Sequence, residues 1–441
     1  PIPAPTFVAT NARPPAEPVG GGLKVASLNV LNYFTTIDEG PDICGPEANL
    51  DCRGADSTFE FERQRAKIVQ ALAGIDADIV GLIEIENHQT DAAIQDLVNG
   101  INDAVGAGTY AYVETGPIGT DAIKVGLIYK PATVSLSGDF AILDSSVDPN
   151  FIDTKNRPAL AQTFQENATG ARLTVTVNHL KSKGSDCNDI GDPDAGDGQG
   201  NCNLTRTSAA QALVNWLAAD PTGSRDPDFL IIGDLNAYAM EDPITAIKDA
   251  GYTDLIRDNV GTEAYSYVFQ AQAGYLDHSL ANVSLVDQVT DVTVWHVNAD
   301  EPIVLDYNTE YKSASQVVEL YNETAYRASD HDPVIVGLEL NAPPDCSQAA
   351  PSIDTLWPVN HKLVTVDVLG VTDPEGDPIT ITFDGVYQDE PVNGDDDGNT
   401  APDADGVGAT TIELRAERDG EGNGRVYHVY FTASDGDGAC S

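Results

Sequence analysis

Short apolar runs, each followed at once by a polar or ionisable side chain, recur through residues 23–340 of this sequence. LKVASLN ends at Asn29, DIVGLIE ends at Glu84 and RLTVTVNH ends at His179. FLIIG is followed by Asp234, and Asp277 lies in YLDH. Runs of this length that are rich in Val, Ile and Leu predict buried strands. The chain must therefore fold so that several polar strand ends are accommodated.

Helical patterns alternate with these strands. Ser57 followed by Glu60 is a capping-box pattern, and further helices are expected after Thr90, over 208–217 and from Asp242. This alternation predicts an α/β fold with mixed sheets that are covered by helices.

The composition changes twice along the chain. Residues 1–21 are rich in Pro, Ala and Gly, which is typical of a linker or N-terminal tail. We expect a catalytic domain over 22–341. From 345 to 441 the strands are short and separated by Gly, Asp and Pro turns, which predicts an all-β sandwich of immunoglobulin type.

The six cysteines form three couples that are close in sequence or bracket one domain. Six cysteines allow fifteen pairings, and the most economical is Cys44–Cys52, Cys187–Cys202 and Cys346–Cys440. The sequence lacks a CxxC spacing, so disulfides in an oxidising, extracytoplasmic compartment are favoured over a zinc site. No apolar run is long enough to span a bilayer.

The net charge is −47, from 70 acidic and 23 basic residues. A DNA-binding protein usually gains affinity from clustered Lys and Arg, so this composition alone argues against nucleic acid. Surface acidity also keeps a protein soluble in a saline medium, and salt screening lets a local basic groove act within about 8 Å. We therefore expect a salt-adapted, marine or halophilic source.

The polar strand ends together suit the hydrolysis of a phosphodiester. Any one of them alone is more simply a hydrogen-bonded strand end, but this explanation is weak for the whole set. Mg²⁺ or Mn²⁺ prefers hard oxygen ligands, and Asn29, Glu84 and Asp330 would supply them. His331, oriented by Asp277, is the candidate base for the attacking water. The remaining candidates, which would donate to phosphoryl oxygens, are Asn236, His179 and Arg157.

The ordered segments GLIEIEN, NHLKS, GDLNAY, YLDH and SDHDPV resemble the motif series of the endonuclease/exonuclease/phosphatase superfamily, which includes deoxyribonuclease I. GLIEIEN, NRPALAQTF, NHLKSKG and GDLNAYAMEDPI resemble in particular the secreted bacterial ExeM/NucH-type nucleases. The resemblance covers about 22–341. It implies a four-layer α/β sandwich of two packed mixed sheets flanked by helices, and products with 5′-phosphate ends.

Residue by residue, the resemblance implies three groups of functional side chains. The metal ligands would be Asn29, Glu84 and Asp330. The catalytic residues would be His179, Asp234, Asn236, Asp277 and His331. The substrate-binding residues would be Arg157, Asn178 and Lys181. A groove beside Arg157 could also be lined by further cations, each of which alone is more often a solvated charge: Lys124, Lys155, Lys183 and Arg206.

Two insertions depart from compact family members, one bearing Cys44 and Cys52 and one over 183–203. The second is acidic and Gly-rich, but it lacks EF-hand spacing, so a solvated, disulfide-closed loop is favoured over a structural Ca²⁺ site.

The sequence is compatible with three functions. The first is a secreted, monomeric nuclease that acts on DNA, with RNA as a second candidate substrate. The second keeps the chemistry but acts on a phospholipid head group or another phosphoester. The third is a noncatalytic surface-binding protein, which would leave every motif idle.

Overall fold

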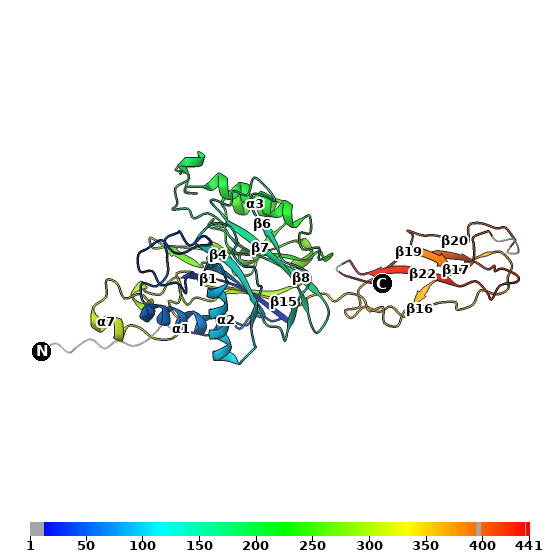
Figure 1. The fold of residues 1–441 in the computed structure, drawn as a ribbon, viewed down its shortest axis with the longest axis horizontal. Helices are drawn as coiled ribbons and strands as arrows, with labels where there is room; N and C mark the ends of the chain where they lie inside the picture. Colours follow the sequence, from blue (N-terminus) through cyan, green and yellow to red (C-terminus); the bar gives the residue numbers. More distant parts are fainter. Residues whose placement is uncertain (1–12, 394–397, 437) are drawn as a thin grey trace. The chain divides into compact units, whose positions relative to one another are not determined.

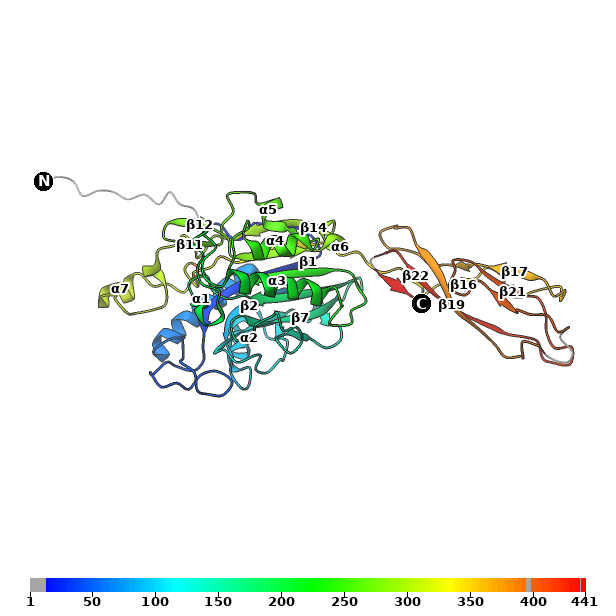
Figure 2. The same cartoon turned by 90° about the horizontal axis from the view of Figure 1, so that it is seen from above.

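The computed structural model describes residues 13–393, 398–436 and 438–441, and Figures 1 and 2 show the chain in two orthogonal views. The chain divides into two compact units. The first holds the chain up to Ala168 and from Arg172 to Leu340, and the second holds Thr169–Ala171 and Asn341–Ser441. Residues 1–12 of the predicted N-terminal linker lie outside the described residues.

The first sheet of the larger unit has six strands in the order β14-β15-β1-β2-β4-β3. β1 and β2 run parallel and the other neighbours are antiparallel, so the sheet is mixed. Its strands are β1 (Leu23–Tyr33), β2 (Ile79–Glu86), β3 (Ala111–Tyr112), β4 (Ile123–Tyr129), β14 (Val289–Val294) and β15 (Val334–Leu338).

The second sheet has the order β10-β13-β9-β8-β7-β5, and β6 also pairs with β7. Here β8 and β9 are the parallel pair. Its strands are β5 (Val134–Leu136), β6 (Ala141–Leu143), β7 (Arg157–Glu166), β8 (Arg172–His179), β9 (Phe229–Asp234), β10 (Thr253–Asp254) and β13 (Asp277–Ala281).

Helices cover the outer faces of both sheets. α1 (Thr58–Ile75) and α2 (Ala92–Val105) share an apolar core with β1 and β2. α3 (Asn203–Leu217) and α4 (Asp242–Asp249) share a second core with β9. Figure 1 shows α1 and α2 below the two sheets and α3 above them. The predicted α/β sandwich with mixed sheets is confirmed.

The inner faces of the two sheets pack directly on each other. A Cβ added at Gly81 of β2 would lie 2.7 Å from Ile232 Cδ1 of β9 and 3.0 Å from Val177 Cγ2 of β8. The missing side chain at Gly81 therefore lets the sheets approach closely. Because β2 is covered on both faces, it reads in the sequence as a nearly continuous apolar run.

Shorter elements complete the larger unit. They are η1 (Asn188–Ile190), α5 (Leu255–Asn259), β11 (Tyr267–Phe269), β12 (Gln272–Gly274), α6 (Val283–Val286), η2 (Ile303–Leu305) and α7 (Ala314–Glu319). β11 and β12 form an antiparallel hairpin.

The start of α1 could be predicted from local sequence, whereas the start of α3 could not. Ser57 caps α1 as predicted, because its Oγ accepts a hydrogen bond from the backbone N–H of Glu60 at 3.3 Å. α3 begins at Asn203, before the expected 208–217. The reason is nonlocal: the carboxylate of Asp192, in the 183–203 insertion, accepts from the backbone N–H of Thr205 at 2.8 Å. Asp192 is buried, so this part of the insertion is not simply solvated.

Residues 13–21, within the predicted linker, lie against the larger unit. Val19 is buried in the core of the first sheet. Its carbonyl accepts a hydrogen bond from Thr290 Oγ1 at 2.7 Å, and the carbonyl of Pro14 accepts one from Trp295 Nε1 at 3.0 Å. The packed unit thus begins before residue 22.

The three predicted disulfides, Cys44–Cys52, Cys187–Cys202 and Cys346–Cys440, are confirmed. The first two close loops of the larger unit, and the third brackets the second unit. No helix in the described part of the chain is long and apolar enough to cross a bilayer.

The second unit is built from strands. They are β16 (Ala350–Pro351), β17 (Leu363–Val366), β18 (Val368–Leu369), β19 (Thr380–Gln388), β20 (Ala404–Asp405), β21 (Ile412–Arg415), β22 (Tyr427–Ser434) and β23 (Ala439–Cys440). They form three small antiparallel sheets with the orders β16-β18, β17-β21-β20 and β19-β22-β23. The predicted all-β character of this unit is confirmed.

Candidate active site

Four polar residues stand side by side across the second sheet. β7 pairs with β8 so that Arg157 lies opposite His179. His179 lies opposite Asp234 of β9, and Asp234 lies opposite Asp277 of β13. Side chains at opposed positions point to the same face of a sheet. The strand register therefore gathers residues from four separate sequence segments into one row.

The first sheet adds Asn29 and Glu84 from β1 and β2. Glu84 has a left-handed backbone with φ 67°, a conformation that a non-glycine residue keeps only when its surroundings impose it. Its Oε2 accepts from the backbone N–H of Asn32 at 3.0 Å. Its Oε1 lies 3.8 Å from His179 Nε2, so the two sheets meet at this point.

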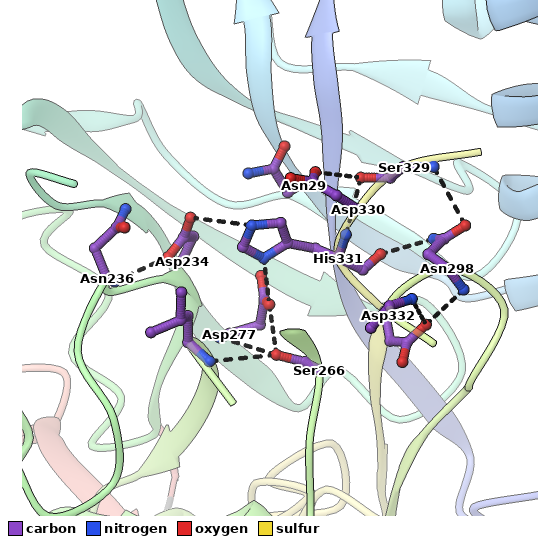
Figure 3. A network of polar contacts seen from close by, with 12 residues as sticks. Asn29, Asp234, Asn236, Ser266, Asp277, Asn298, Ser329, Asp330, His331 and Asp332 are labelled. Atoms are coloured by element: carbon purple, nitrogen blue, oxygen red, sulfur yellow. Dashed lines mark hydrogen bonds and ion pairs between the residues drawn. The ribbon is translucent and has the colours of Figure 1, made fainter. Parts of the chain in front are cut away.

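His331 forms a hydrogen-bonded pair with Asp277, and neighbouring residues hold both side chains in place (Figure 3). Its Nδ1 lies 2.7 Å from Asp277 Oδ2, and the same oxygen accepts from Ser266 Oγ at 2.6 Å. The ring of Tyr267 lies 4.6 Å from the imidazole, centroid to centroid. These contacts fix the imidazole orientation, and its Nε2 lies 3.9 Å from Asp234 Oδ2.

Asn298 and Asp332 hold the chain segment that carries His331. Asn298 Nδ2 donates to the carbonyl of His331 at 2.7 Å, and its Oδ1 accepts from the backbone N–H of Ala328 at 2.8 Å. Asp332 Oδ1 accepts from the backbone N–H of Asn298 at 2.7 Å. Sequence reasoning missed Asn298 and Ser266, because neither lies in a recognisable motif.

Asp234 and Asn236 lie where β9 leaves the sheet. Asp234 Oδ1 accepts from the backbone N–H of Asn236 at 2.8 Å. Asn236 Nδ2 donates to the carbonyl of Leu180 at 3.1 Å. Gly233 permits this geometry, since a Cβ there would lie 2.3 Å from the carbonyl oxygen of Asn178.

The structure does not bring Asn178 to this cluster, which corrects its predicted role in substrate binding. Its side chain is fully buried, and Nδ2 donates to the carbonyls of Thr176 and Ile232 at 2.9 and 3.2 Å. Successive side chains of a strand point to opposite faces, so Asn178 faces away from the side that His179 occupies. Asp330 is half-buried and precedes His331, on the side of the cluster nearest Asn29 (Figure 3).

Three of the predicted groove cations have structural partners instead. Lys124 pairs with Asp91, and Lys183 pairs with Glu241. Arg206 is fully buried and donates to backbone carbonyls, including that of Asn201 at 2.7 Å. These three side chains stabilise loops, and Lys155 Nζ lies 2.7 Å from Asp189 Oδ1, so Arg157 and Lys181 remain as the candidate groove residues.

The surroundings of Glu84 and Asp234 disfavour the charged form of both carboxylates. Burial, and then the negative charge of Asp330, raise the pKa of Glu84. Burial raises the pKa of Asp234 to about 7, and Asp277 adds to this effect. Clustered, desolvated carboxylates of this kind are stabilised by a positive charge between them.

The two imidazoles of the site differ in their charge preference. Burial lowers the pKa of His179 well below its ordinary value, and the positive charge of Arg157 lowers it further. Burial would also lower the pKa of His331, but the carboxylates of Asp277 and Asp330 raise it well above its ordinary value. His331 therefore binds a proton readily, whereas His179 stays neutral.

An oxygen-preferring divalent cation fits the donors on the Glu84 side of the cluster. Asn29 contributes an amide, while Glu84 and Asp330 contribute carboxylates, which are the hard ligands that Mg²⁺ or Mn²⁺ selects. A cation bound here would relieve the repulsion by which Asp330 raises the pKa of Glu84. Glu86 has another task, since its Oε2 accepts from the backbone N–H of Thr35 at 2.8 Å.

A separate acidic group lies outside this cluster. Carboxylate oxygens of Asp56, Glu60 and Glu310 lie within 4.8 Å of one another. Glu60 is already satisfied, because its Oε2 accepts from the backbone N–H of Asp56 and its Oε1 accepts from Thr309 Oγ1. This group is not part of the row of catalytic candidates.

Comparison with known proteins identifies one family. Residues 48–331 match the Endonuclease/Exonuclease/phosphatase family model. No curated protein matches the chain.

Three similar solved structures are matched over nearly all of their own chains. An endonuclease/exonuclease/phosphatase family protein from Bacteroides thetaiotaomicron is 16% identical, and the match covers 71% of this chain and 96% of that one, with TM-score 0.45. A mannosyl-6-phosphatase from Bacteroides thetaiotaomicron VPI-5482 is 17% identical, with coverages of 72% and 99% and TM-score 0.44. D. rerio TDP2, complexed with a single-strand DNA product, is 14% identical, with coverages of 71% and 97% and TM-score 0.42.

Proposed function

Because this chain belongs to the Endonuclease/Exonuclease/phosphatase family, we propose that it is a secreted, divalent-metal-dependent nuclease that hydrolyses phosphodiester bonds of extracellular DNA. RNA is a further substrate to be tested. One observation carries the proposal: the His331–Asp277 hydrogen bond of 2.7 Å stands beside the oxygen donors Glu84 and Asp330. A base and a cation site together are what hydrolysis of a phosphodiester requires.

In this proposal Asn29, Glu84 and Asp330 hold Mg²⁺ or Mn²⁺. When bound, the cation supplies positive charge that stabilises the phosphoryl oxygens in the transition state. Glu84 is positioned for this by its left-handed backbone and by the hydrogen bond from Asn32.

His331 is the proposed general base. Asp277 accepts the Nδ1 proton of His331, which leaves Nε2 free to take a proton from water. The water oxygen then attacks phosphorus and the bond from phosphorus to the 3′ oxygen breaks. The 3′ oxygen takes a proton from solvent, so the products end in a 3′-hydroxyl and a 5′-phosphate. Asp234, 3.9 Å from Nε2, would orient the water or the protonated imidazole.

The remaining donors face the scissile phosphate in this proposal. His179 is neutral, so it would donate a hydrogen bond to a phosphoryl oxygen or to the leaving oxygen. Asn236 would bind another oxygen of the scissile phosphate, while Arg157 and Lys181 would bind substrate phosphate beyond it. Arg157 can serve in this way because its Nη1 is buried and lacks a hydrogen-bond partner in the described parts of the chain.

Several attributes belong to the same proposal. The three disulfides support secretion into an oxidising compartment. We further propose an ExeM/NucH-type enzyme that is monomeric and salt-adapted, with an immunoglobulin-like second unit. A structural Ca²⁺ stays a prediction, which a Ca²⁺-dependent rise in melting temperature would test.

Turnover of DNA, RNA and sphingomyelin in one buffer tests the function. The purified chain should cut plasmid DNA with Mg²⁺ or Mn²⁺ and stop when EDTA is added. Efficient turnover of sphingomyelin with intact DNA would move the assignment to phospholipid head groups. An absence of turnover with any phosphoester would leave a noncatalytic role.

A further inference from the structure

A group of cations continues the catalytic row beyond His179. Asp121 joins two of them: Arg53 Nη2 lies 2.8 Å from Asp121 Oδ1, and Arg157 Nε lies 3.0 Å from Asp121 Oδ2. Lys181 follows His179 by two residues, where the chain leaves β8. Arg53 directly follows the loop closed by Cys44–Cys52, so this disulfide-closed loop reaches the edge of the site.

The insertion is anchored so that Arg53 and Asp121 are held together. Cys44 and Cys52 pack with Phe34, Ala122 and Ile123 in one small buried cluster. Arg53 directly follows Cys52, and Asp121 directly precedes Ala122. The disulfide and the end of β4 therefore fix both partners of the ion pair before any ligand binds.

This group has more positive charge than its own carboxylate neutralises. Arg53 and Arg157 both pair with Asp121, and Lys181 lies close enough to interact electrostatically with Arg157 and Asp121. This excess of cations occurs in a chain with 70 acidic and 23 basic residues. Burial lowers the pKa of Lys181, and Arg157 lowers it further. Arg157 is 7% exposed, and its buried Nη1 has no hydrogen-bond partner among the residues that the structure describes. An anion at this place would satisfy that donor and relieve the repulsion.

We propose, on the premise of the proposed function, that Arg53, Arg157 and Lys181 form a second anion subsite, which binds the phosphate next to the scissile one. The side chain of Arg53 is 40% exposed, so it can reach a ligand. The row from Asp277 to Arg157 crosses three strand spacings, or roughly 14 Å, which is longer than one phosphate needs. The substrate of this site is accordingly a polynucleotide strand and not an isolated phosphate ester.

Salt-dependent binding of a fluorescent single-stranded DNA 12-mer tests this subsite. Binding is measured in Mg²⁺ with the His331→Ala chain, so that the probe stays intact. Adding Arg53→Gln should weaken binding about fivefold to tenfold at low salt. It should also reduce the slope of log K against log salt by about 0.7, because one phosphate contact is lost.

Arg225→Gln is the matched control. Arg225 is also exposed, and it precedes β9 at the end of the strand opposite Asp234. It removes the same charge far from the proposed subsite, so its slope should equal that of the parent chain. Equal slopes and affinities for Arg53→Gln and Arg225→Gln would overturn the subsite.

A kinetic comparison separates failure of the subsite from failure of the proposed function. In the otherwise native chain, Arg53→Gln should lower kcat/KM for the 12-mer at least fivefold more than kcat/KM for bis(p-nitrophenyl) phosphate, which has one phosphate. Equal losses on both substrates would refute the subsite while leaving the nuclease assignment intact. A native chain that neither binds nor cuts the 12-mer would refute both.

Discussion

Each of the two units of this chain is stabilised internally by a different kind of interaction. In the larger unit, two extensive apolar cores lie between sheets and helices, with side chains such as Leu72 and Leu213 fully buried. In the second unit, the apolar cluster has four buried members among the described residues, which are Val366, Phe383, Ile412 and Leu414, and partly buried apolar side chains pack around them.

The second unit compensates with a buried ion cluster and a long-range disulfide. The Arg425 side chain is 1% exposed, and its Nη1 lies 2.6 Å from Asp403 Oδ2 and 3.1 Å from Glu417 Oε1. Cys346–Cys440 links residues 94 positions apart. Small domains with little apolar burial commonly depend on such cross-links.

In this molecule the catalytic candidates and the long-range disulfide lie in different units. Every catalytic candidate lies in the larger unit, where broad apolar packing tolerates costly polar groups such as Glu84 and Asp234. The second unit has its own buried charges, which Arg425 pairs with Asp403 and Glu417. We therefore expect perturbations of one unit to leave the other nearly unchanged.

The largest effect should come from His331→Ala. Losing the base should lower kcat for plasmid cleavage about 10³-fold while the chain stays folded, although some stability is lost because Asp277 loses a buried partner. Steady-state kinetics and thermal melting would measure both effects. His428→Ala, at an exposed position of β22, is the control and should cut normally. Normal cleavage by His331→Ala would assign the base to another residue.

The next largest effect concerns the second unit. Replacing Cys346 and Cys440 by Ser should destabilise this unit by about 4–5 kcal/mol, since a closed loop of nearly 100 residues is released. Denaturant unfolding followed by limited proteolysis would detect the change, and DNA cleavage should persist. Opening Cys44–Cys52, which spans 8 positions, should cost less, and the loss should appear in the larger unit. Simultaneous unfolding of both units would contradict their independent stabilisation.

Arg425→Met should destabilise the second unit by about 3 kcal/mol, because Asp403 and Glu417 would be left buried without their cation. Urea unfolding measures this loss. Arg418→Met, at a neighbouring exposed position, should change stability by less than about 0.5 kcal/mol. If the two variants unfold alike, the ion cluster contributes little.

The smallest effect expected is a shift in pH dependence. Asp277 and Asp330 raise the pKa of His331, so the catalytically competent, unprotonated base is lost as pH falls through a value above 6.5. Asp277→Asn removes one of these charges, lowers the pKa of His331 and should move the acid limb of kcat/KM to lower pH. Asp384→Asn in the second unit should leave the profile in place. An unmoved acid limb in Asp277→Asn would contradict the proposed pair.

Much of the site could be predicted because strand ends leave a local signal. Asn29, Glu84, His179 and Asp234 each end an apolar run, and these runs became β1, β2, β8 and β9. The disulfides could be predicted for a similar reason, since their partners are close in sequence or bracket one unit.

Other features depend on contacts that have no local signal. Ser266 supports Asp277 from a loop, and Asn298 holds the His331 backbone from another loop. Asp121 orients Arg53 only because two distant segments pack on one disulfide. The error at Asn178 has a simple cause: the motif includes it, but strand alternation turns its side chain to the other face.

Local periodicity and spacing in the sequence were enough to identify strands and the polar residues at their ends, and they favoured one of the fifteen possible cysteine pairings. Only the tertiary structure decided the register that aligns Arg157, His179, Asp234 and Asp277, and the close approach of Glu84 from the other sheet. Register is set by hydrogen bonding and packing between distant strands, so no single strand contains it.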